Sequence, residues 1–97
     1  MLSIQEREGR LVFTFSGRLD TAECLQFDER VASAAEAASQ PVVFDLGGVD
    51  YVASLFLRIC VRTAKGVGFE RFTLENVNPS IRKVLKIAGL DGPLSLE

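Results

Sequence analysis

The chain contains no histidine, no tryptophan and only two cysteines among its 97 residues. Histidine is the usual base beside a serine or cysteine nucleophile and the commonest metal ligand, so its absence removes the ordinary catalytic arrangements. Cys24 and Cys60 form no metal-ligand spacing, and both lie in apolar stretches. We expect them to be reduced core thiols. The sequence therefore predicts no enzyme activity, no catalytic residue, no metal site and no cofactor.

Long apolar runs and an excess of basic residues are also absent. No segment approaches the roughly 20 apolar residues that cross a bilayer. Met1 to Arg10 lacks the basic and then apolar order of a signal peptide. The net charge is −2, with both signs interspersed, so no basic surface for a phosphate backbone is predicted. We expect a cytoplasmic protein that binds neither membranes nor nucleic acid.

The residues that are present describe one compact domain. Hydrophobic residues make up 47% of the chain and charged residues 25%, which is ordinary for a folded protein. A chain of this length can bury one modest core. No repeat, linker or low-complexity segment interrupts it, so we expect a single domain over residues 1–97.

The first half predicts a hairpin, a helix and a strand. Apolar residues alternate on both sides of a turn at Gly9, as in a β-hairpin. Asp20 can cap a helix, and Glu23 stands where it would complete a capping box. After this helix, Val42 to Leu46 is a nearly continuous apolar run, typical of a central strand. We expect Gly47-Gly48 to end that strand.

The second half predicts two further strand and helix pairs. A helix is expected at about Leu55 to Lys65, closed by glycines at 66 and 68, and a strand from Arg71 to Val77. Asn78-Pro79 is a cap followed by a first-turn proline, and a last short strand is expected near Leu94 and Leu96. The order ββαβαβαβ predicts an α/β fold in which helices pack on a mixed sheet of four to five strands.

The stretch from Val43 to Arg58 resembles the signature of STAS domains. In that signature an apolar strand ends in Asp-Leu, a short turn follows, and a serine-containing loop opens a helix. Gly17 to Asp20 is similar to the family's second-strand exit, and Asn78 to Asp91 is similar to its third helix and the turn beyond. The resemblance covers nearly the whole chain and implies a STAS-like fold. The usual C-terminal fourth helix has no counterpart before Glu97.

The resemblance implies a function in bacterial signal transduction and transcription regulation. In anti-sigma factor antagonists, the unphosphorylated domain binds an anti-sigma factor kinase, and phosphorylation of a serine before the second helix releases it. This mechanism is called partner switching. A phosphate adds about −1.5 to −2 charge and can repel an acidic partner or suit a helix start. The expected partner of this chain is therefore an anti-sigma factor or a serine kinase-like protein.

The chain departs from the family pattern at the phosphorylation loop. The phosphorylatable version has Asp-Ser-Ser-Gly-Leu, with the second serine as acceptor, and here the run is Ala53-Ser54-Leu55-Phe56-Leu57. Leu55 therefore stands at the acceptor position and cannot take phosphate. Ser54 is either a helix N-cap or a displaced phosphoacceptor, and we favour the cap. We expect the phosphorylation switch to be lost or altered.

A helical wheel of the second helix predicts a small docking surface. The apolar arc centres on Leu57, Cys60 and Ala64, which places Leu55 and Ile59 at the surface beside cationic side chains. Phe56 either fills a gap left by Ala53 or pushes Leu55 outward. The predicted partner-binding residues belong to this helix start and to the loop at Asp20: Asp20, Thr21, Ala53, Ser54, Leu55, Phe56, Arg58, Ile59 and Arg62.

Two other functions compete with this one. A nucleotide- or small-ligand-sensing module would use a shallow cleft lined by Gly47-Gly48 and Asp20. An assembly subunit would form homo-oligomers through exposed strand edges or through the Leu55–Ile59 strip.

Overall fold

The computed structural model describes residues 1–97 and confirms the predicted element order. The elements are, in order, β1 (Leu2–Arg7), β2 (Arg10–Leu19), α1 (Thr21–Ala37), β3 (Val42–Val52), α2 (Ser54–Val67), β4 (Phe72–Glu75), α3 (Pro79–Ile87) and β5 (Ser95–Leu96). A short 3₁₀ turn, Phe69–Arg71, leads into β4.

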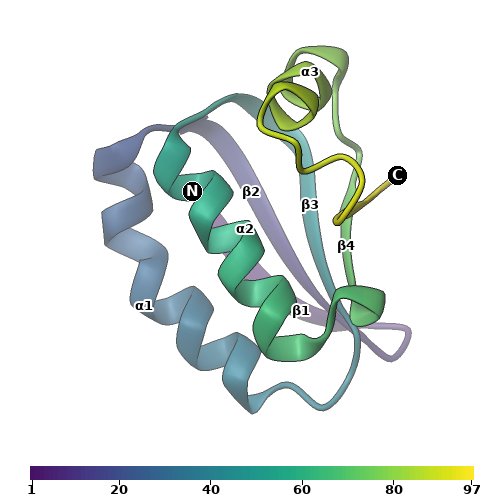
Figure 1. Cartoon of the computed structure of the whole chain (residues 1–97). Coiled ribbons are helices and arrows are strands. Elements are labelled where there is room, and N and C mark those ends of the chain that lie inside the picture. The colour runs from purple at the N-terminus through teal and green to yellow at the C-terminus, as the bar shows by residue number, and fades with distance from the viewer.

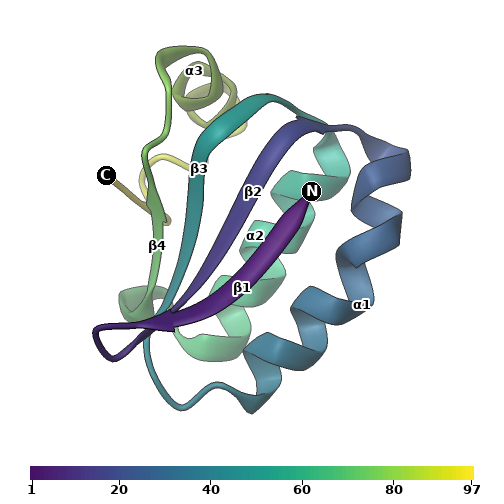
Figure 2. The same ribbon diagram turned by 180° about the vertical axis from the view of Figure 1, so that it is seen from behind.

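The five strands form one mixed sheet in the order β1-β2-β3-β4-β5, so the predicted architecture is confirmed. β1 pairs antiparallel with β2, and every later pair is parallel. Figure 1 shows α1 and α2 side by side on one face of the sheet, with α3 beyond the ends of β3 and β4. Figure 2 shows the opposite face, which no helix covers. Parallel strands joined by helical crossovers produce this one-sided cover.

Phenylalanines fill the layer between the sheet and the two helices. Phe15 from β2 lies 4.9 Å from Phe44 of β3 and 5.1 Å from Phe56 of α2, between ring centroids, and both pairs are edge-to-face. Phe27 of α1 and Phe72 of β4 extend the cluster to either side. Aromatic pairs in this geometry add about 0.5–1.5 kcal/mol beyond the area they bury. The cluster therefore fixes both helices to the same part of the sheet.

An ion pair crosses the face of the sheet that has no helices. Arg10 of β2 contacts Glu75 of β4 at 2.8 Å, from strands on either side of β3. The hydrogen bond and charge of Glu75 raise the pKa of the Arg10 guanidinium. By strand alternation both side chains share a face with Val12 and Val43, which are buried but lie outside the main core. The sheet thus protects apolar surface without a second helical layer.

Gly47 and Gly48 do not end the central strand, contrary to our expectation. β3 runs through them to Val52, and its register with β2 shifts between Thr14 and Ser16. A Cβ on Gly48 would lie 3.2 Å from the Ser16 Cβ, so glycine permits a close approach of the two strands at this irregularity. β3 therefore continues through both glycines to the start of α2.

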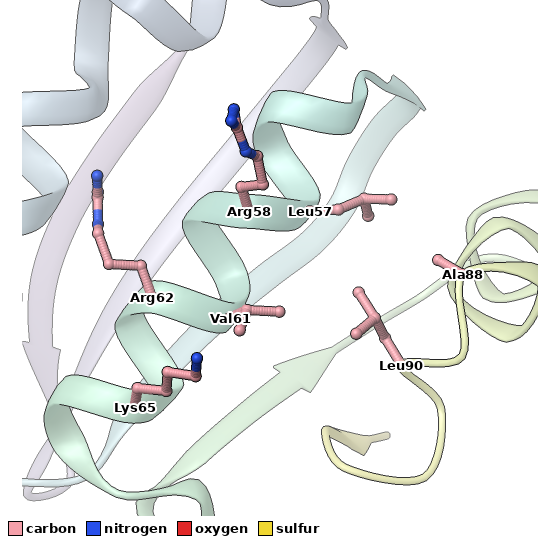
Figure 3. Close-up of a pocket in the computed structure, with 7 residues that line it drawn as sticks. All are labelled: Leu57, Arg58, Val61, Arg62, Lys65, Ala88 and Leu90. Carbon is pink, nitrogen blue, oxygen red and sulfur yellow. The ribbon is translucent and has the colours of Figure 1, made fainter.

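The flank of α2 that faces α3 is more open than the flank that faces α1. Leu57 and Val61 point from α2 toward Ala88 and Leu90 (Figure 3) and remain partly exposed. On the α1 flank, Ile59 and Thr63 are buried. The core of α2 is thus rotated toward α1 relative to the predicted wheel.

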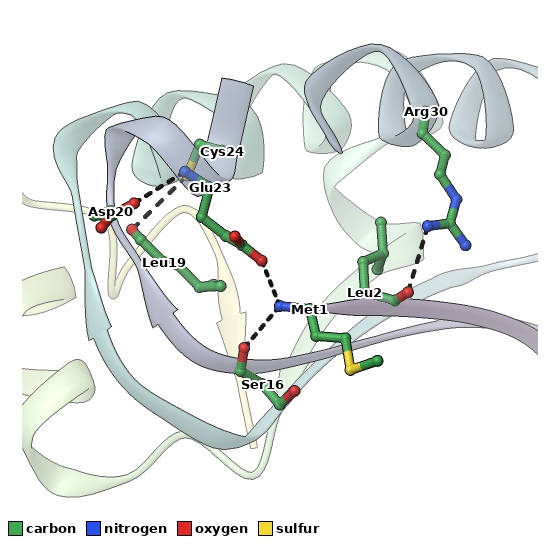
Figure 4. A network of polar contacts seen from close by, with 8 residues as sticks. All are labelled: Met1, Leu2, Ser16, Leu19, Asp20, Glu23, Cys24 and Arg30. Carbon is green, nitrogen blue, oxygen red and sulfur yellow. Dashed lines mark hydrogen bonds and ion pairs between the residues drawn. The ribbon is translucent and has the colours of Figure 1, made fainter. Parts of the chain in front are cut away.

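The predicted cap of α1 is confirmed, but the capping box is not closed. The Glu23 backbone N–H donates to Asp20 Oδ1 at 2.9 Å. The Glu23 carboxylate instead contacts the Met1 amino group at 2.6 Å, and that amino group also donates to Ser16 O at 3.0 Å (Figure 4). β1 brings this cationic partner to Glu23, and a charged partner competes with the Asp20 backbone N–H. β1 is thereby tied to the start of α1.

The start of α3 follows the sequence prediction. Asn78 Oδ1 accepts from the Ile81 backbone N–H at 3.0 Å, and Pro79 occupies the first turn. Asn78 Nδ2 also donates to Val49 O at 2.8 Å, which joins α3 to β3. None of the three helices has both the length and the apolar character needed to cross a membrane.

Candidate docking site

The structure brings the Asp20 loop and the start of α2 together at one edge of the sheet. Leu19 pairs with Val52 at the carboxyl ends of the parallel strands β2 and β3. The Ala53 backbone N–H then donates to Leu19 O at 2.9 Å. Because both strands lead directly into helices, α1 and α2 begin side by side (Figure 1). Asp20 and Thr21 therefore stand next to Ala53 and Ser54.

Ser54 does not cap α2, so the favoured interpretation of this residue is wrong. Ala53 occupies the N-cap position in an extended conformation, and its carbonyl accepts from the Phe56 N–H at 3.0 Å. Ser54 is already inside the helix, one position too late for its hydroxyl to cap. No side chain caps this helix start, and the exposed Ser54 hydroxyl makes no hydrogen bond within the chain. A helix start without a cap has free N–H groups and a partial positive charge.

The predicted surface strip of Leu55 and Ile59 is also wrong. Ile59 is 1% exposed and belongs to the core, and Leu55 is half-buried against it. The wheel failed because α2 packs on the sheet and on α1 at once, which widens and rotates its buried arc. Thr63 is buried in the same arc because its hydroxyl donates to Ile59 O at 2.8 Å. The residues of α2 that are buried are Phe56, Ile59, Cys60, Thr63 and Ala64.

Phe56 fills space in the core. It is 1% exposed and packs against Phe15 and Phe44, with ring centroids 5.1 and 6.0 Å away. Ala53 beside it is also buried. The interpretation of Phe56 as a gap filler is therefore supported. Phe56 and Ala53 lie beneath the candidate docking site and do not form its surface.

The two arginines predicted at the rim differ in availability. Arg62 Nη1 contacts Asp28 Oδ1 of α1 at 2.6 Å, and Arg62 Nη2 donates to the Asp28 carbonyl at 3.3 Å. Arg58 is exposed and has no ion-pair partner. Arg58 is thus the rim cation that is free to meet another molecule, whereas Arg62 joins the two helices.

Three exposed residues near the carboxyl ends of β2 and β3 were not predicted. Arg18 places its guanidinium carbon 4.0 Å from the ring centre of Tyr51, which is 39% exposed. Leu25, in the first turns of α1, is 66% exposed. Leu25 lies off the buried stripe of its helix, so a wheel of that helix could have found it. The Arg18–Tyr51 contact depends on a register shift between Gly17 and Arg18 that the sequence does not reveal.

We call the resulting surface the helix-start face. It has an apolar centre, a free cation and an exposed hydroxyl. Its residues are Asp20, Thr21, Leu25, Ser54, Leu55 and Arg58. Arg18 and Tyr51 point to the other face of the sheet, because their strand neighbours Leu19 and Val52 belong to the core.

The two cysteines of the chain are buried core residues. Cys24 and Cys60 are free and fully buried. Burial raises the pKa of Cys24 to about 11 and that of Cys60 further still, so both are protonated at neutral pH. No cluster of acidic or thiol side chains could hold a metal ion. None of the four surface hollows is lined by Gly47, Gly48 or Asp20, the residues of the alternative ligand cleft.

A mixed five-stranded sheet with two helices opening together at the carboxyl ends of β2 and β3 defines a small α/β domain of the STAS type. The family model described as Mlab, STAS domain, matches residues 2–96. The chain belongs to the STAS domain family.

Similar proteins agree with this class. BtrV of Bordetella bronchiseptica, which is named "putative anti-sigma factor antagonist", is 28% identical over 90 residues, which cover 91% of this chain and 78% of BtrV. A STAS domain protein from Planctomyces limnophilus matches with a TM-score of 0.89 and 25% identity, over 98% of this chain and 87% of the other. An anti-sigma factor antagonist from Mycobacterium paratuberculosis matches with a TM-score of 0.87 and 26% identity, over 99% and 83%. The chain thus has the fold of anti-sigma factor antagonists, and these relatives are named as regulators rather than as enzymes.

Proposed function

We propose that residues 1–97 act as a single, non-enzymatic STAS domain of the anti-sigma factor antagonist kind in the bacterial cytoplasm. In this proposal it docks to an anti-sigma factor or serine kinase-like protein through the helix-start face. The names of its relatives support the kind of partner. The observation that carries the proposal is the Ala53–Leu19 hydrogen bond, which holds the Asp20 loop against the start of α2.

The composition of the helix-start face suits a protein partner. Leu25 exposes apolar surface in the first turns of α1, and Leu55 is half-buried against the core at the start of α2. Arg58 and Asp20 supply charge of both signs at its edge. An apolar centre with an arginine and a polar rim is the usual anatomy of a protein interface.

We propose that the phosphorylation switch is altered in this chain. Leu55 holds the family's acceptor position, and its side chain has no hydroxyl that could take phosphate. Ser54 remains a candidate acceptor, because its hydroxyl is exposed and unbonded. The unmodified domain would therefore bind constitutively, or be controlled through its partner. Stoichiometric phosphate on Ser54 after treatment with a native kinase, detected by mass spectrometry, would contradict constitutive binding.

A pull-down from the native host tests the docking face. We expect the wild-type domain to recover an anti-sigma factor or serine kinase-like protein, and the variant Ser54→Glu to lose it, because the new charge lies at the centre of the face. Ser80→Glu is the matched control, since Ser80 is also an exposed serine in the first turn of a helix, α3. Recovery of the same partners by all three proteins would remove the helix-start face from the proposal but leave the fold unchanged.

Association between copies is the second candidate function. β1 is the outermost strand of the sheet, and its outer edge pairs with no other strand. Free strand edges can template pairing between chains. Sedimentation velocity over a range of concentrations would show a dimer or larger species if this edge is used, and a constant monomer if it is not.

A further inference from the structure

A groove lies between α2 and the segment that follows α3, and it meets the helix-start face at Arg58. Its volume is about 480 Å³. We call it the α2–α3 groove. Four apolar residues and three cations line it (Figure 3): Leu57, Val61, Ala88, Leu90, Arg58, Arg62 and Lys65.

The groove exists because the helical layer is incomplete over one side of the sheet. α1 and α2 lie over β1, β2 and β3, while only α3 and its connection to β5 lie on the β4 side (Figure 1). Leu57 and Val61 therefore have neighbours on α2 and at Leu90, but no helix packs along them. On α3, Val84 and Ile87 are 38% and 78% exposed. The apolar surface of this region continues beyond the groove itself.

Every charged residue that lines the groove is a cation. α2 carries Arg58, Arg62 and Lys65 without an acidic residue. α3 likewise carries only cations: Arg82, Lys83 and Lys86. The whole chain has a net charge of −2, so this positive region is a local segregation. Only Arg62 among these six cations has an ion-pair partner, and Arg58 and Lys65 at the groove have none.

We infer that the α2–α3 groove binds an acidic amphipathic helix of another protein. The apolar face of that helix would lie on Leu57, Val61 and Leu90, and its carboxylates would meet Arg58 and Lys65. Leu57, Val61 and Lys65 follow one another at intervals of four residues, so they form a straight ridge along α2. A second helix packs naturally along such a ridge. The charge complementarity sets the chemistry of the partner.

Other occupants fit the groove less well. A second copy of this chain would have to supply α1, its acidic helix, but Leu25 is the only large apolar side chain that α1 exposes. A membrane surface is flat, whereas the apolar residues Ala88 and Leu90 lie across a groove from α2 (Figure 3). A rod-shaped acidic partner satisfies both the shape and the charge.

An NMR titration with a designed peptide tests this inference. The probe is a 16-residue helical peptide with leucines along one face and glutamates along the others. Two control peptides carry the same residues in scrambled order, or lysine in place of glutamate. We expect the amide shifts of the ¹⁵N-labelled domain to change at Leu57, Val61 and Leu90 with the glutamate peptide, and the affinity to fall as salt is raised.

Two variants that lie outside the helix-start face sharpen the test. Val61→Asp is expected to weaken binding at least 10-fold, because Val61 is partly exposed and lies at the centre of the ridge. Lys65→Glu is expected to weaken it roughly 3- to 5-fold, as for an exposed charge pair. Lys83→Glu is the matched control, since Lys83 does not line the groove. Unchanged thermal melting of each variant establishes that it is folded.

Three results would overturn the inference. The first is equal binding of the glutamate and scrambled peptides, and the second is the absence of shifts at the groove up to millimolar peptide. The third is concentration-dependent dimerisation in sedimentation that Val61→Asp abolishes, since the groove would then be an interface between copies. The pull-down with Ser54→Glu can fail or succeed separately, because Ser54 lies outside the groove.

Discussion

The two helices that open at the same edge of the sheet begin in different ways. Asp20 caps α1 through the Glu23 N–H, and Glu23 is further held by the Met1 amino group. α2 begins at Ala53 without any side-chain cap and exposes the Ser54 hydroxyl. The start of α1 has a side-chain acceptor for a backbone N–H group, whereas the start of α2 has none and leaves its N–H groups free at the surface. In a binding site at this edge, the start of α1 is therefore held by contacts within the chain, and the start of α2 has groups free to bind a partner.

The uncapped start must be held in place by packing, and this gives the largest expected effect. Ile59→Ala removes a side chain that is 1% exposed, and we expect it to lower the free energy of unfolding by about 2–5 kcal/mol. Leu55→Ala, in the preceding turn, is the matched comparison and should cost less, since Leu55 is only half-buried. Urea unfolding followed by circular dichroism measures both.

Equal costs for these two substitutions would contradict the burial pattern of α2. They would indicate that Leu55 and Ile59 share one environment, as the helical wheel predicted. The start of α2 would then be less firmly anchored, and the contrast with α1 would weaken.

The cap of α1 gives the next largest effect. Asp20→Ala removes the acceptor of the Glu23 N–H, and we expect it to lower the free energy of unfolding by about 1 kcal/mol. Asp20→Asn should retain most of the stability, because an amide oxygen can accept the same hydrogen bond. Thermal or urea unfolding distinguishes the two variants. If Asp20→Ala costs nothing, α1 is no better capped than α2 and the comparison fails.

The fold could be predicted from local sequence signals because each one is satisfied by near neighbours. Alternation around Gly9, the cap at Asp20 and the Asn78-Pro79 helix start all act within a few residues. The position of Ser54 could not be predicted as readily, since the N-cap is fixed by where β3 ends. β3 ends late because Gly48 lies close against Ser16, a contact between distant parts of the chain.

The candidate site was less predictable than the fold for the same reason. The sequence placed the Asp20 loop and the start of α2 at one site only through the family resemblance. Ile59 was assigned to the surface because a wheel of a single helix contains no information about α1. The α2–α3 groove depends on how separate elements pack, so periodicity could not reveal it. Leu25 differs, because it lies off the buried stripe of α1 and a wheel of that helix could have found it.

The smallest expected effect concerns Ser54 itself and tests the uncapped start most directly. Ser54→Ala should change the free energy of unfolding by less than about 0.5 kcal/mol, because the hydroxyl makes no hydrogen bond and is exposed. Ser54→Asp should raise it by about 0.3–1 kcal/mol, since a carboxylate beside a helix start interacts favourably with the free N–H groups. The gain should disappear as the pH falls through the carboxyl pKa near 4, because only the charged form is stabilised.

Ser80→Asp is the control for Ser54→Asp. It places the same charge in the first turn of α3, where Asn78 already accepts from the Ile81 N–H, so its gain should be smaller. A cost of about 1 kcal/mol for Ser54→Ala would contradict us, because that is the value expected of a capping serine. The hydroxyl would then stabilise α2, and Ser54 would not be a free group on the helix-start face.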